Sequence, residues 1–391
     1  MASYRLIHPY RDVAIVGVRN TEQARRLPGH DSVSIAVEGA LGALEDAGLE
    51  PADVDAVVGG IAQELILMLR LGPCTRVPNQ LGIPAVLQAA QMIASRQAET
   101  VLIPAGGAAM YTDRTATAPW TRPANELVVG YGLFTAAEFA LMARRHMIVH
   151  GTTPEQLATV AATIRNNGHV NPEAVYFGRG PFTPADVLAS RMIADPFHLL
   201  DCSMTSEGGC GLVLTTAERA HDRPHAPVWI LGGASDSFGP AYQLAPMWDM
   251  TGRTDLPAGY VGRHAAQQAF ATAGLGPDHV DVCELYDPFS FEIIRQLEAF
   301  GFCEEGEGGA FVTDGNIAPG GRLPVTTDGG TMSFSHAGIA AQQLQRVIRG
   351  TQQLRGECAT NQVPGASVAL CTNGGSGALF TDVLLLGSER P

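Results

Sequence analysis

The segment AGLEPADVD at residues 47–55 recurs as AGLGPDHVD at residues 273–281, and 273 − 47 and 281 − 55 both give an offset of 226. An alanine-rich amphipathic stretch precedes each copy, and an apolar run follows it. A glycine directly after a helical pattern is the usual left-handed C-cap, so Gly48 and Gly274 are predicted to end two equivalent helices. The repeat predicts a chain built twice from the same elements.

A second pair of matching stretches extends the repeat. LGI at 81–83 and AGI at 337–339 each open a helical pattern, which is followed by an apolar strand and a glycine pair. The helices are expected at 84–94 and 340–349, the strands at 101–103 and 367–370, and the glycine turns at 106–107 and 374–375. Strands that alternate with helices indicate sheets covered on both faces. The predicted fold class is therefore α/β, a duplicated five-layer α/β/α/β/α sandwich.

The duplication divides the chain into an N-terminal half, 1–235, and a C-terminal half, 236–391. The first half contains an insertion at about 111–198 that is rich in proline, arginine, histidine and aromatic residues. A long excursion inside a compact fold is usually a lid or a binding loop. An arm that contacts a second subunit is the alternative.

Composition excludes several kinds of chemistry. The formal net charge is −14, and all 25 basic residues are arginine. A basic face for nucleic acid is not expected. Without lysine, a Schiff base, pyridoxal phosphate and the lysine-bearing phosphate loop are all excluded.

The cysteines and histidines indicate a reduced protein without a metal site. The seven cysteines are irregularly spaced and form no C-x-x-C pair, which is typical of free thiols in a cytoplasmic protein. His146 and His150 form a histidine pair at helical spacing, and two arginines precede them, which favours a solvated or CoA-facing helix over a metal site. The first eleven residues lack an apolar signal core, and no apolar stretch is long enough to span a bilayer.

Three motifs carry a resemblance to a known family. LLDCSMTSEG at 199–208 resembles "LLDC-x-x-x-SDG", TDGGTMSFSH at 327–336 resembles "NTDGG…GHP", and CTNGGSG at 371–377 resembles "C-x-GGG-x-G". In this order, on a duplicated chain, they are similar to the thiolase superfamily, in the branch of the sterol-carrier-protein thiolases. The resemblance covers nearly the whole chain and implies the same five-layer fold.

The thiolase nucleophile is missing from its expected place. Thiolases carry this cysteine about fourteen residues before an "I-A-x-G-x-A" helix end, which here reads IASRQA at 93–98. The corresponding position holds Asn79. A carboxamide does not attack thioesters, so no acyl-enzyme is expected there. Cys74, five residues earlier, could replace the nucleophile only if the loop shifted.

The resemblance assigns further site residues. His336 matches the histidine of "GHP", and Cys371 matches the second thiolase cysteine, an acid/base. Tyr286 and Asp287 open a YDPF sequence that resembles the actinobacterial steroid side-chain aldolases. These aldolases lack the nucleophilic cysteine, cleave a β-hydroxyacyl-CoA and work beside a small OB-fold protein. They carry a second tyrosine near the place of His336.

The resemblance implies retro-aldol cleavage of a bulky, steroid-like acyl-CoA, with CoA as part of the substrate and no permanent cofactor. A neutral histidine is a natural base near pH 7, whereas a tyrosine with a reference pKa of about 10 is a better donor. Asn79 and the backbone of Gly374 and Gly375 could stabilise an enolate. Asp287 is a further catalytic candidate or a turn-former, and Gly330 and Gly338 are predicted to bind the substrate.

The sequence also allows other functions for the chain and other roles for these residues. The chain could be a thiolase-type acyltransferase, which Asn79 disfavours, or a silent lipid-binding subunit, which the retained His336 and Cys371 disfavour. Tyr286 and Cys371 could simply pack in the core, and Asn79 could be a helix N-cap. Exposed sheet edges predict a homodimer, and the resemblance predicts an OB-fold, zinc-ribbon partner near 111–198 or Tyr286.

Overall fold

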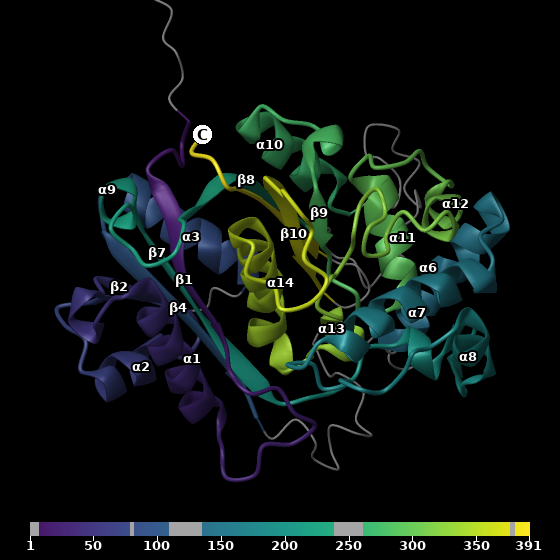
Figure 1. The fold of residues 1–391 in the computed structure, drawn as a ribbon, viewed down its shortest axis with the longest axis horizontal. Helices are drawn as coiled ribbons and strands as arrows, with labels where there is room; N and C mark the ends of the chain where they lie inside the picture. Colours follow the sequence, from purple (N-terminus) through teal and green to yellow (C-terminus); the bar gives the residue numbers. More distant parts are fainter. Residues whose placement is uncertain (1–7, 79–81, 109–134, 238–260, 376–379) are drawn as a thin grey trace, which may run out of the picture.

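A computed structural model describes residues 8–78, 82–108, 135–237, 261–375 and 380–391 of the chain. Nine strands form a sheet that folds back on itself, with helices between its two arms and on its outer faces (Figure 1). The arrangement has the alternating helix and strand layers that the sequence predicts.

The sheet is continuous across the two halves of the chain. Its strands lie in the order β3 (Thr75–Val77), β2 (Ala56–Val58), β4 (Thr100–Gly107), β7 (Gly208–Thr216), β1 (Val13–Asn20), β8 (Val228–Ser237), β11 (Phe380–Gly387), β10 (Val368–Gly374) and β9 (Val282–Glu284). The two arms meet at β1 and β8, where Ala14 pairs with Trp229 and Ile15 with Val228. This short seam allows the sheet to bend there.

The strand order repeats about this seam. β2 runs parallel to β4, β4 pairs antiparallel with β7, and β7 pairs antiparallel with β1. β9, β10, β11 and β8 are connected in the same way. The duplication is therefore present in the fold. The predicted boundary between 235 and 236 falls inside β8, and that division of the chain stays a prediction.

Two helices fill the space between the arms. α14 (Gly338–Arg355) contacts β4 and β7 on one side and β9 and β10 on the other, and α3 (Gly82–Ala94) packs beside it. On the outer faces, α1 (Ser32–Ala47) covers β1, β4 and β7, and α10 (Arg263–Ala273) covers β8 and β11. The middle helices occupy the predicted places but are longer than 84–94 and 340–349.

The outer helices end where the repeat predicts. Gly48 (φ 62°) and Gly274 (φ 65°) adopt the left-handed conformation that terminates α1 and α10. At the start of α1, the Asp31 carboxylate accepts a 2.7 Å hydrogen bond from the Ser34 backbone N–H. These caps confirm the helix ends inferred from the repeated AGL sequence.

Apolar side chains form two cores, one on each face of the sheet. One core lies between the arms and includes Ile83, Leu344 and Leu384. The other lies beneath the outer helices and includes Leu44 and Phe291. Because both faces are covered, β1 is buried from Val13 to Val18 and reads as a nearly continuous apolar run.

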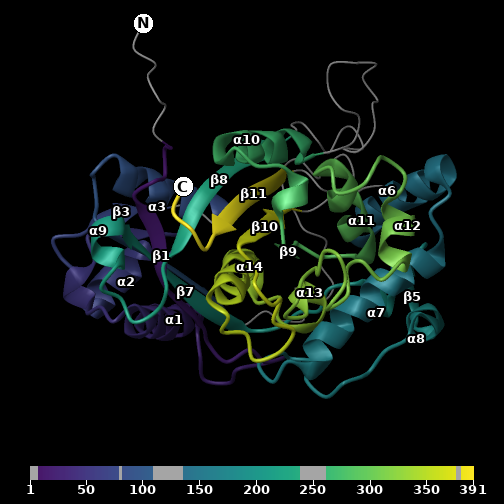
Figure 2. The same cartoon turned by 45° about the horizontal axis from the view of Figure 1, so that its top comes forward.

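The described part of the insertion is largely helical. It comprises α6 (Thr135–His150), α7 (Pro154–Val170), α8 (Pro184–Ala189), β5 (Met192–Ala194) and β6 (Phe197–His198). α7 packs against α11 (Ser290–Ala299), α12 (Gly308–Thr313) and α13 (Gly330–Ser333), which belong to the C-terminal half of the chain (Figure 2). A Cβ on Gly168 of α7 would lie 2.2 Å from Ser333 Oγ, so this contact requires glycine. Residues 111–134 of the insertion lie outside the described residues.

The remaining elements are short connections. They are α2 (Ala62–Leu69), α9 (Ala217–Ala220) and the 3₁₀ turns η1 (Pro51–Asp53), η3 (Leu199–Asp201) and η4 (Pro277–His279). Within the ranges that the structure describes, no helix combines the length and apolar character needed to cross a membrane.

Candidate active site

Tyr286 lies between β9 and α11 and is 7% exposed. Its backbone N–H donates to Thr372 Oγ1 at 2.9 Å, and its carbonyl oxygen accepts from Gln296 Nε2 at 2.7 Å. A Cβ on Gly374 would lie 3.1 Å from the tyrosine ring. The end of β10 and the helix α11 therefore hold this residue in place.

Asp287 is fully buried and caps the next helix in space. Its Oδ1 accepts from the Thr331 N–H at 2.7 Å, and its Oδ2 accepts from the Met332 N–H at 3.1 Å. The Thr331 hydroxyl also donates to the Asp287 carbonyl at 2.8 Å. Burial raises the pKa of the Asp287 carboxyl to about 7, although Arg346 and these N–H groups oppose the shift. These contacts tie Asp287 to the N–H groups of α13.

His336 follows α13 and is partly buried. Its Nδ1 lies 2.7 Å from the carbonyl oxygen of Met204. Because a carbonyl only accepts, Nδ1 carries the proton in the neutral ring, and Nε2 retains a free lone pair. Burial lowers the pKa of His336, and the hydrogen bond to Met204 offsets this only in part. The ring is therefore suited to accept a proton at neutral pH.

The backbone of His336 is held by a buried hydroxyl network. Its N–H donates to Ser206 Oγ at 2.8 Å, and the hydroxyls of Ser206 and Ser335 lie 3.2 Å apart. Ser335 then donates to Gln23 Oε1 at 2.6 Å. Gln23 belongs to the N-terminal half, so both halves of the chain position this histidine.

Two of the predicted binding glycines, Gly330 and Gly338, adopt a left-handed backbone conformation. Gly330 has a φ of 59°, and a Cβ there would lie 2.2 Å from Asp287 Oδ2. Gly338 opens α14 with a φ of 70°. Gly374 contacts Tyr286, and the Gly375 N–H donates to the Phe380 carbonyl at 3.3 Å. Their role in substrate binding stays a prediction.

A buried cluster of charged side chains lies next to this region. Arg346 of α14 donates both Nη groups to the Asp328 carboxylate at 2.7 Å each. Glu284 lies 3.9 Å from Arg346, and it accepts from the Thr327 hydroxyl at 2.6 Å. Burial and the neighbouring Asp328 raise the pKa of Glu284 to about 7, against the effect of Arg349 and Arg346. The cluster fixes the loop that leads into α13.

Arg165 joins the insertion to this loop. It is 2% exposed, and its guanidinium donates to three carbonyl oxygens, those of Leu200, Cys202 and Met332, at 2.7, 2.8 and 2.9 Å. Sequence reasoning did not single out Arg165 or Arg346.

Comparisons with known proteins agree with this arrangement. A family model described as "Thiolase C-terminal domain-like" matches residues 246–388. A protein of Thermomonospora curvata named steroid side-chain-cleaving aldolase is 33% identical over 96% of this chain and 98% of its own length. The chain belongs to the thiolase superfamily.

Two further relatives place the chain within this superfamily. An acetyl-CoA acetyltransferase of Methanothermobacter thermautotrophicus is 33% identical over 94% of this chain and 97% of its own length. A solved structure described as "Ltp2-ChsH2(DUF35) aldolase" has a TM-score of 0.85 and 32% identity, covering 98% of this chain and 99% of that chain. The relatives of this chain therefore include proteins named as aldolases and a protein named as an acetyltransferase.

Asn79, which the sequence resemblance predicts to stand at the nucleophile position of thiolases, lies outside the described residues. The structure begins again at Gly82, the first residue of α3. A small apolar cavity of about 60 Å³ adjoins this helix start and is lined by Gly82, Ala340 and Leu344, among others. The starts of α3 and α14 therefore lie close together, as the predicted pseudo-symmetry requires.

Cys371, which matches the superfamily's second cysteine, is fully buried in the core between the arms. A Cβ on Gly350 of α14 would lie 2.6 Å from its Sγ. Burial, with the nearby Glu284 carboxylate, raises the pKa of this thiol well above its usual range. The seven cysteines all lie among the described residues and form no disulfide. The acid/base role of Cys371 stays a prediction.

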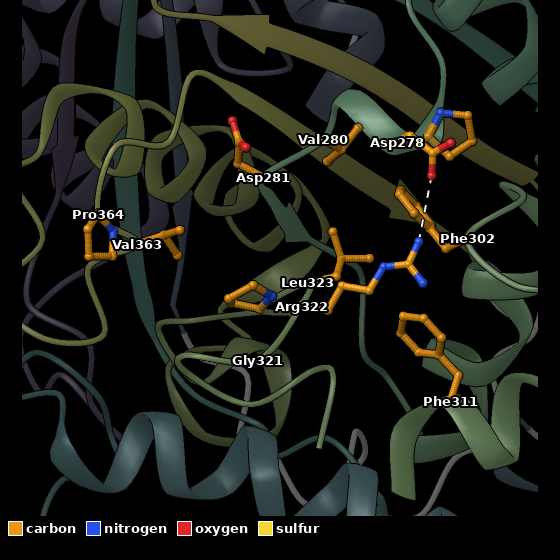
Figure 3. A pocket seen from close by; sticks show the side chains of 12 residues that line it. Asp278, Val280, Asp281, Phe302, Phe311, Gly321, Arg322, Leu323, Val363 and Pro364 are labelled. Carbon is orange, nitrogen blue, oxygen red and sulfur yellow. Dashed lines mark ion pairs between the residues drawn. The ribbon is translucent and has the colours of Figure 1, made fainter. Parts of the chain in front are cut away.

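Two other features lie apart from these residues. Both ring nitrogens of His146 have partners, because Nδ1 lies 2.7 Å from Thr152 Oγ1 and Nε2 lies 3.0 Å from Glu298 Oε2. A larger cavity of about 310 Å³ is lined by Phe302, Phe311 and Arg322, and Arg322 pairs with Asp278 across it (Figure 3). None of the predicted site residues lines this cavity.

Proposed function

We propose that this chain is a carbon–carbon lyase that cleaves a β-hydroxyacyl-CoA by a retro-aldol reaction. The geometry of His336 carries the proposal, because its Nε2 is an available base while Nδ1 is bound to Met204. The aldolase names of two full-length relatives support the reaction class.

The first step is proton removal. His336 Nε2 takes the proton of the β-hydroxyl group as the bond between the α- and β-carbons breaks. The β-carbon becomes a carbonyl, and the electron pair of the broken bond forms the thioester enolate. The lowered pKa of His336 keeps the ring neutral and ready to act as base at pH 7.

The second step is enolate stabilisation and protonation. A good hydrogen-bond donor at developing negative charge contributes roughly 3–4 kcal/mol. The side chain of Asn79 is the proposed donor, assisted by the dipoles of α3 and α14. Tyr286 is the proposed acid that protonates the α-carbon and is regenerated by the proton from His336.

Asp287 and Cys371 have supporting roles in this scheme. Asp287 holds Thr331 and Met332 of α13 and so positions the segment that ends at His336. Cys371 remains a predicted acid/base, and its burial against Gly350 favours a packing role. Replacing Cys371 by alanine tests this, with Cys283→Ala as a control for an equally buried thiol.

The substrate and partners follow from the relatives. We propose a bulky steroid acyl group, because the Thermomonospora protein is named for steroid side-chain cleavage. CoA enters as part of the substrate and not as a resident cofactor. The name of the aldolase complex with ChsH2(DUF35) supports a partner protein. We also propose that this partner is a small OB-fold, zinc-ribbon protein and that the chain forms a homodimer. Light scattering and co-purification test these two points.

A second candidate is a thiolase-type acyltransferase. The 33% identity to an acetyl-CoA acetyltransferase favours it. The carboxamide at Asn79 disfavours it, because transfer through an acyl-enzyme requires a nucleophile. Mass spectrometry of the protein after incubation with acyl-CoA separates the two candidates, since only the transferase forms a covalent adduct.

A further inference from the structure

The guanidinium of Arg165, on α7, connects the two sequence motifs that meet at His336. Its Nε donates to the Leu200 carbonyl at 2.7 Å and its Nη2 donates to the Cys202 carbonyl at 2.8 Å, both in the LLDCSMTSEG motif. Its Nη1 donates to the Met332 carbonyl at 2.9 Å, in the TDGGTMSFSH motif. One side chain of the insertion therefore ties together two segments that are far apart in the sequence.

The same two motifs are joined directly at Met204. Its backbone N–H donates to the Thr331 carbonyl at 3.1 Å, and its carbonyl oxygen accepts from Nδ1 of His336 at 2.7 Å. Cys202 precedes Met204 by two residues, and Met332 follows Thr331 directly. The guanidinium therefore binds the chain next to both ends of the first bond, and the second bond fixes the tautomer of the histidine.

Neighbouring residues of the insertion hold the guanidinium in this place. The ring of Tyr176 lies with its centroid 5.1 Å from Cζ of Arg165, which is the geometry of a cation–π contact. The Tyr176 N–H donates to the Ser333 carbonyl at 3.1 Å, and the Val175 N–H donates to the Phe334 carbonyl at 3.0 Å. The insertion therefore contacts the segment that leads to the histidine at several consecutive residues.

The bonds of Arg165 depend on the shape of an arginine side chain. Its N–H donors lie in one plane with fixed directions, so they can bind three carbonyl oxygens of two segments at once. Lysine carries a compact charge on a flexible stem and has no such planar arrangement of donors. Because Arg165 is 2% exposed, a carbonyl that loses this donor is left buried without a replacement from bulk water.

We propose that Arg165 is a positioning residue for His336 and keeps Nδ1 of the ring on the Met204 carbonyl. The inference rests on the proposed function, in which Nε2 of His336 is the base. If the two motifs separate, the bond to Met204 no longer selects one tautomer. A ring that carries its proton on Nε2 cannot accept a proton there, so the base would be lost for part of the time.

The test replaces Arg165 without changing its charge. Arg165→Lys should lower kcat roughly ten- to a hundredfold with little change in KM, because the base is misplaced and the binding groups remain. Arg355→Lys is the matched control. The side chain of Arg355 is also buried, and it donates to the Ala226 carbonyl at 3.1 Å and to Asp46 at 3.0 Å, at the far end of α14. This control should keep the kcat of the wild type.

The position of the proton on His336 gives a readout that a loss of stability alone does not change. Nitrogen NMR of histidine-labelled protein, with the signals assigned by comparison with His336→Ala, reports which ring nitrogen carries the proton. The wild type and Arg355→Lys should have the proton on Nδ1, whereas Arg165→Lys should show a mixture of both tautomers.

A milder variant covers the case in which Arg165→Lys does not fold. Tyr176→Leu removes the ring beside the guanidinium and leaves its three carbonyl bonds, so it should change kcat and the tautomer in the same direction but less. The positioning role is overturned by an Nδ1 proton that persists in every folded variant, by a normal kcat in Arg165→Lys, or by an equal tautomer change in Arg355→Lys. A wild-type protein without any cleavage refutes the proposed function, and the NMR comparison, which needs no turnover, then still decides whether Arg165 positions His336.

Discussion

His336 donates its Nδ1 proton to the carbonyl oxygen of Met204 at 2.7 Å, which leaves Nε2 as the basic nitrogen of the ring. Met204 lies in the motif at 199–208, which begins with η3, whereas His336 ends the motif at 327–336, which contains α13. Two of the three sequence motifs are therefore in contact at the imidazole of His336. The hydrogen bond between them determines the tautomer of this ring.

The first prediction concerns the pH dependence of His336. A base must be unprotonated, so kcat/KM should fall as the pH drops through the pKa of this histidine. Because burial lowers that pKa, the fall should lie below the ordinary value of 6.5. His336→Ala should reduce kcat by roughly 10²–10⁴ and leave substrate binding largely intact. His279→Ala, an exposed histidine, serves as the control in the same pH–rate measurement.

The second prediction concerns the hydroxyl group of Tyr286. Tyr286→Phe keeps the ring against Gly374 and removes only the proposed acid, so kcat should again fall roughly 10²–10⁴-fold. Binding of acyl-CoA by calorimetry should be close to that of the wild type. Tyr10→Phe is the matched control, since Tyr10 is a partly buried tyrosine that packs against the core between the arms. Near-normal turnover by both Tyr286→Phe and His336→Ala would contradict the assignment of the acid and the base.

The third prediction concerns Asn79 at the nucleophile position. Asn79→Ala should lose less activity than the acid or base variants, because it removes one donor and no proton-transfer group. Asn79→Cys should gain a trace of acyl-enzyme, detectable as an added acyl mass. A covalent adduct on the wild-type chain would instead reveal another nucleophile, with Cys74 as the first candidate.

The fourth prediction concerns stability and pH. Glu284 and Asp287 both have a folded-state pKa raised to about 7 by burial, so the folded protein binds more protons than the unfolded chain between about pH 4 and 7. Stability from these groups is fully present below their unfolded pKa and is lost as the pH rises through 7. The melting temperature should therefore fall as the pH rises from about 4 to about 7. Glu284→Gln should flatten it, and a slope equal to that of the wild type would contradict the assignment.

Much of the fold could be predicted from sequence because its signals are local. The repeated AGL segments place Gly48 and Gly274, and each sits at a left-handed helix end. The buried charges could not be predicted in this way. Arg346 and Asp328 are adjacent only after α14 docks against the loop, and a buried arginine in a helix has the same sequence pattern as an exposed one.

The contacts of the insertion could not be predicted from the sequence either. Its composition predicts a lid, a binding loop or a dimer-contact arm, yet α7 packs closely against α13 through Gly168 and Arg165. Asn373 belongs to the CTNGGSG motif at 371–377, but its partners Ile83 and Asp382 come from other elements. Contacts of this kind depend on the tertiary arrangement and leave no periodic pattern in the sequence.

Product analysis tests the central claim most directly. The purified chain, alone and with a candidate OB-fold partner, is incubated with a steroid β-hydroxyacyl-CoA, and the products are measured by mass spectrometry. The account predicts equal amounts of a steroid carbonyl compound and a shortened acyl-CoA, with no acyl group on the protein. Unchanged substrate under both conditions, or transfer of the acyl group to free CoA through a covalent adduct, would contradict it.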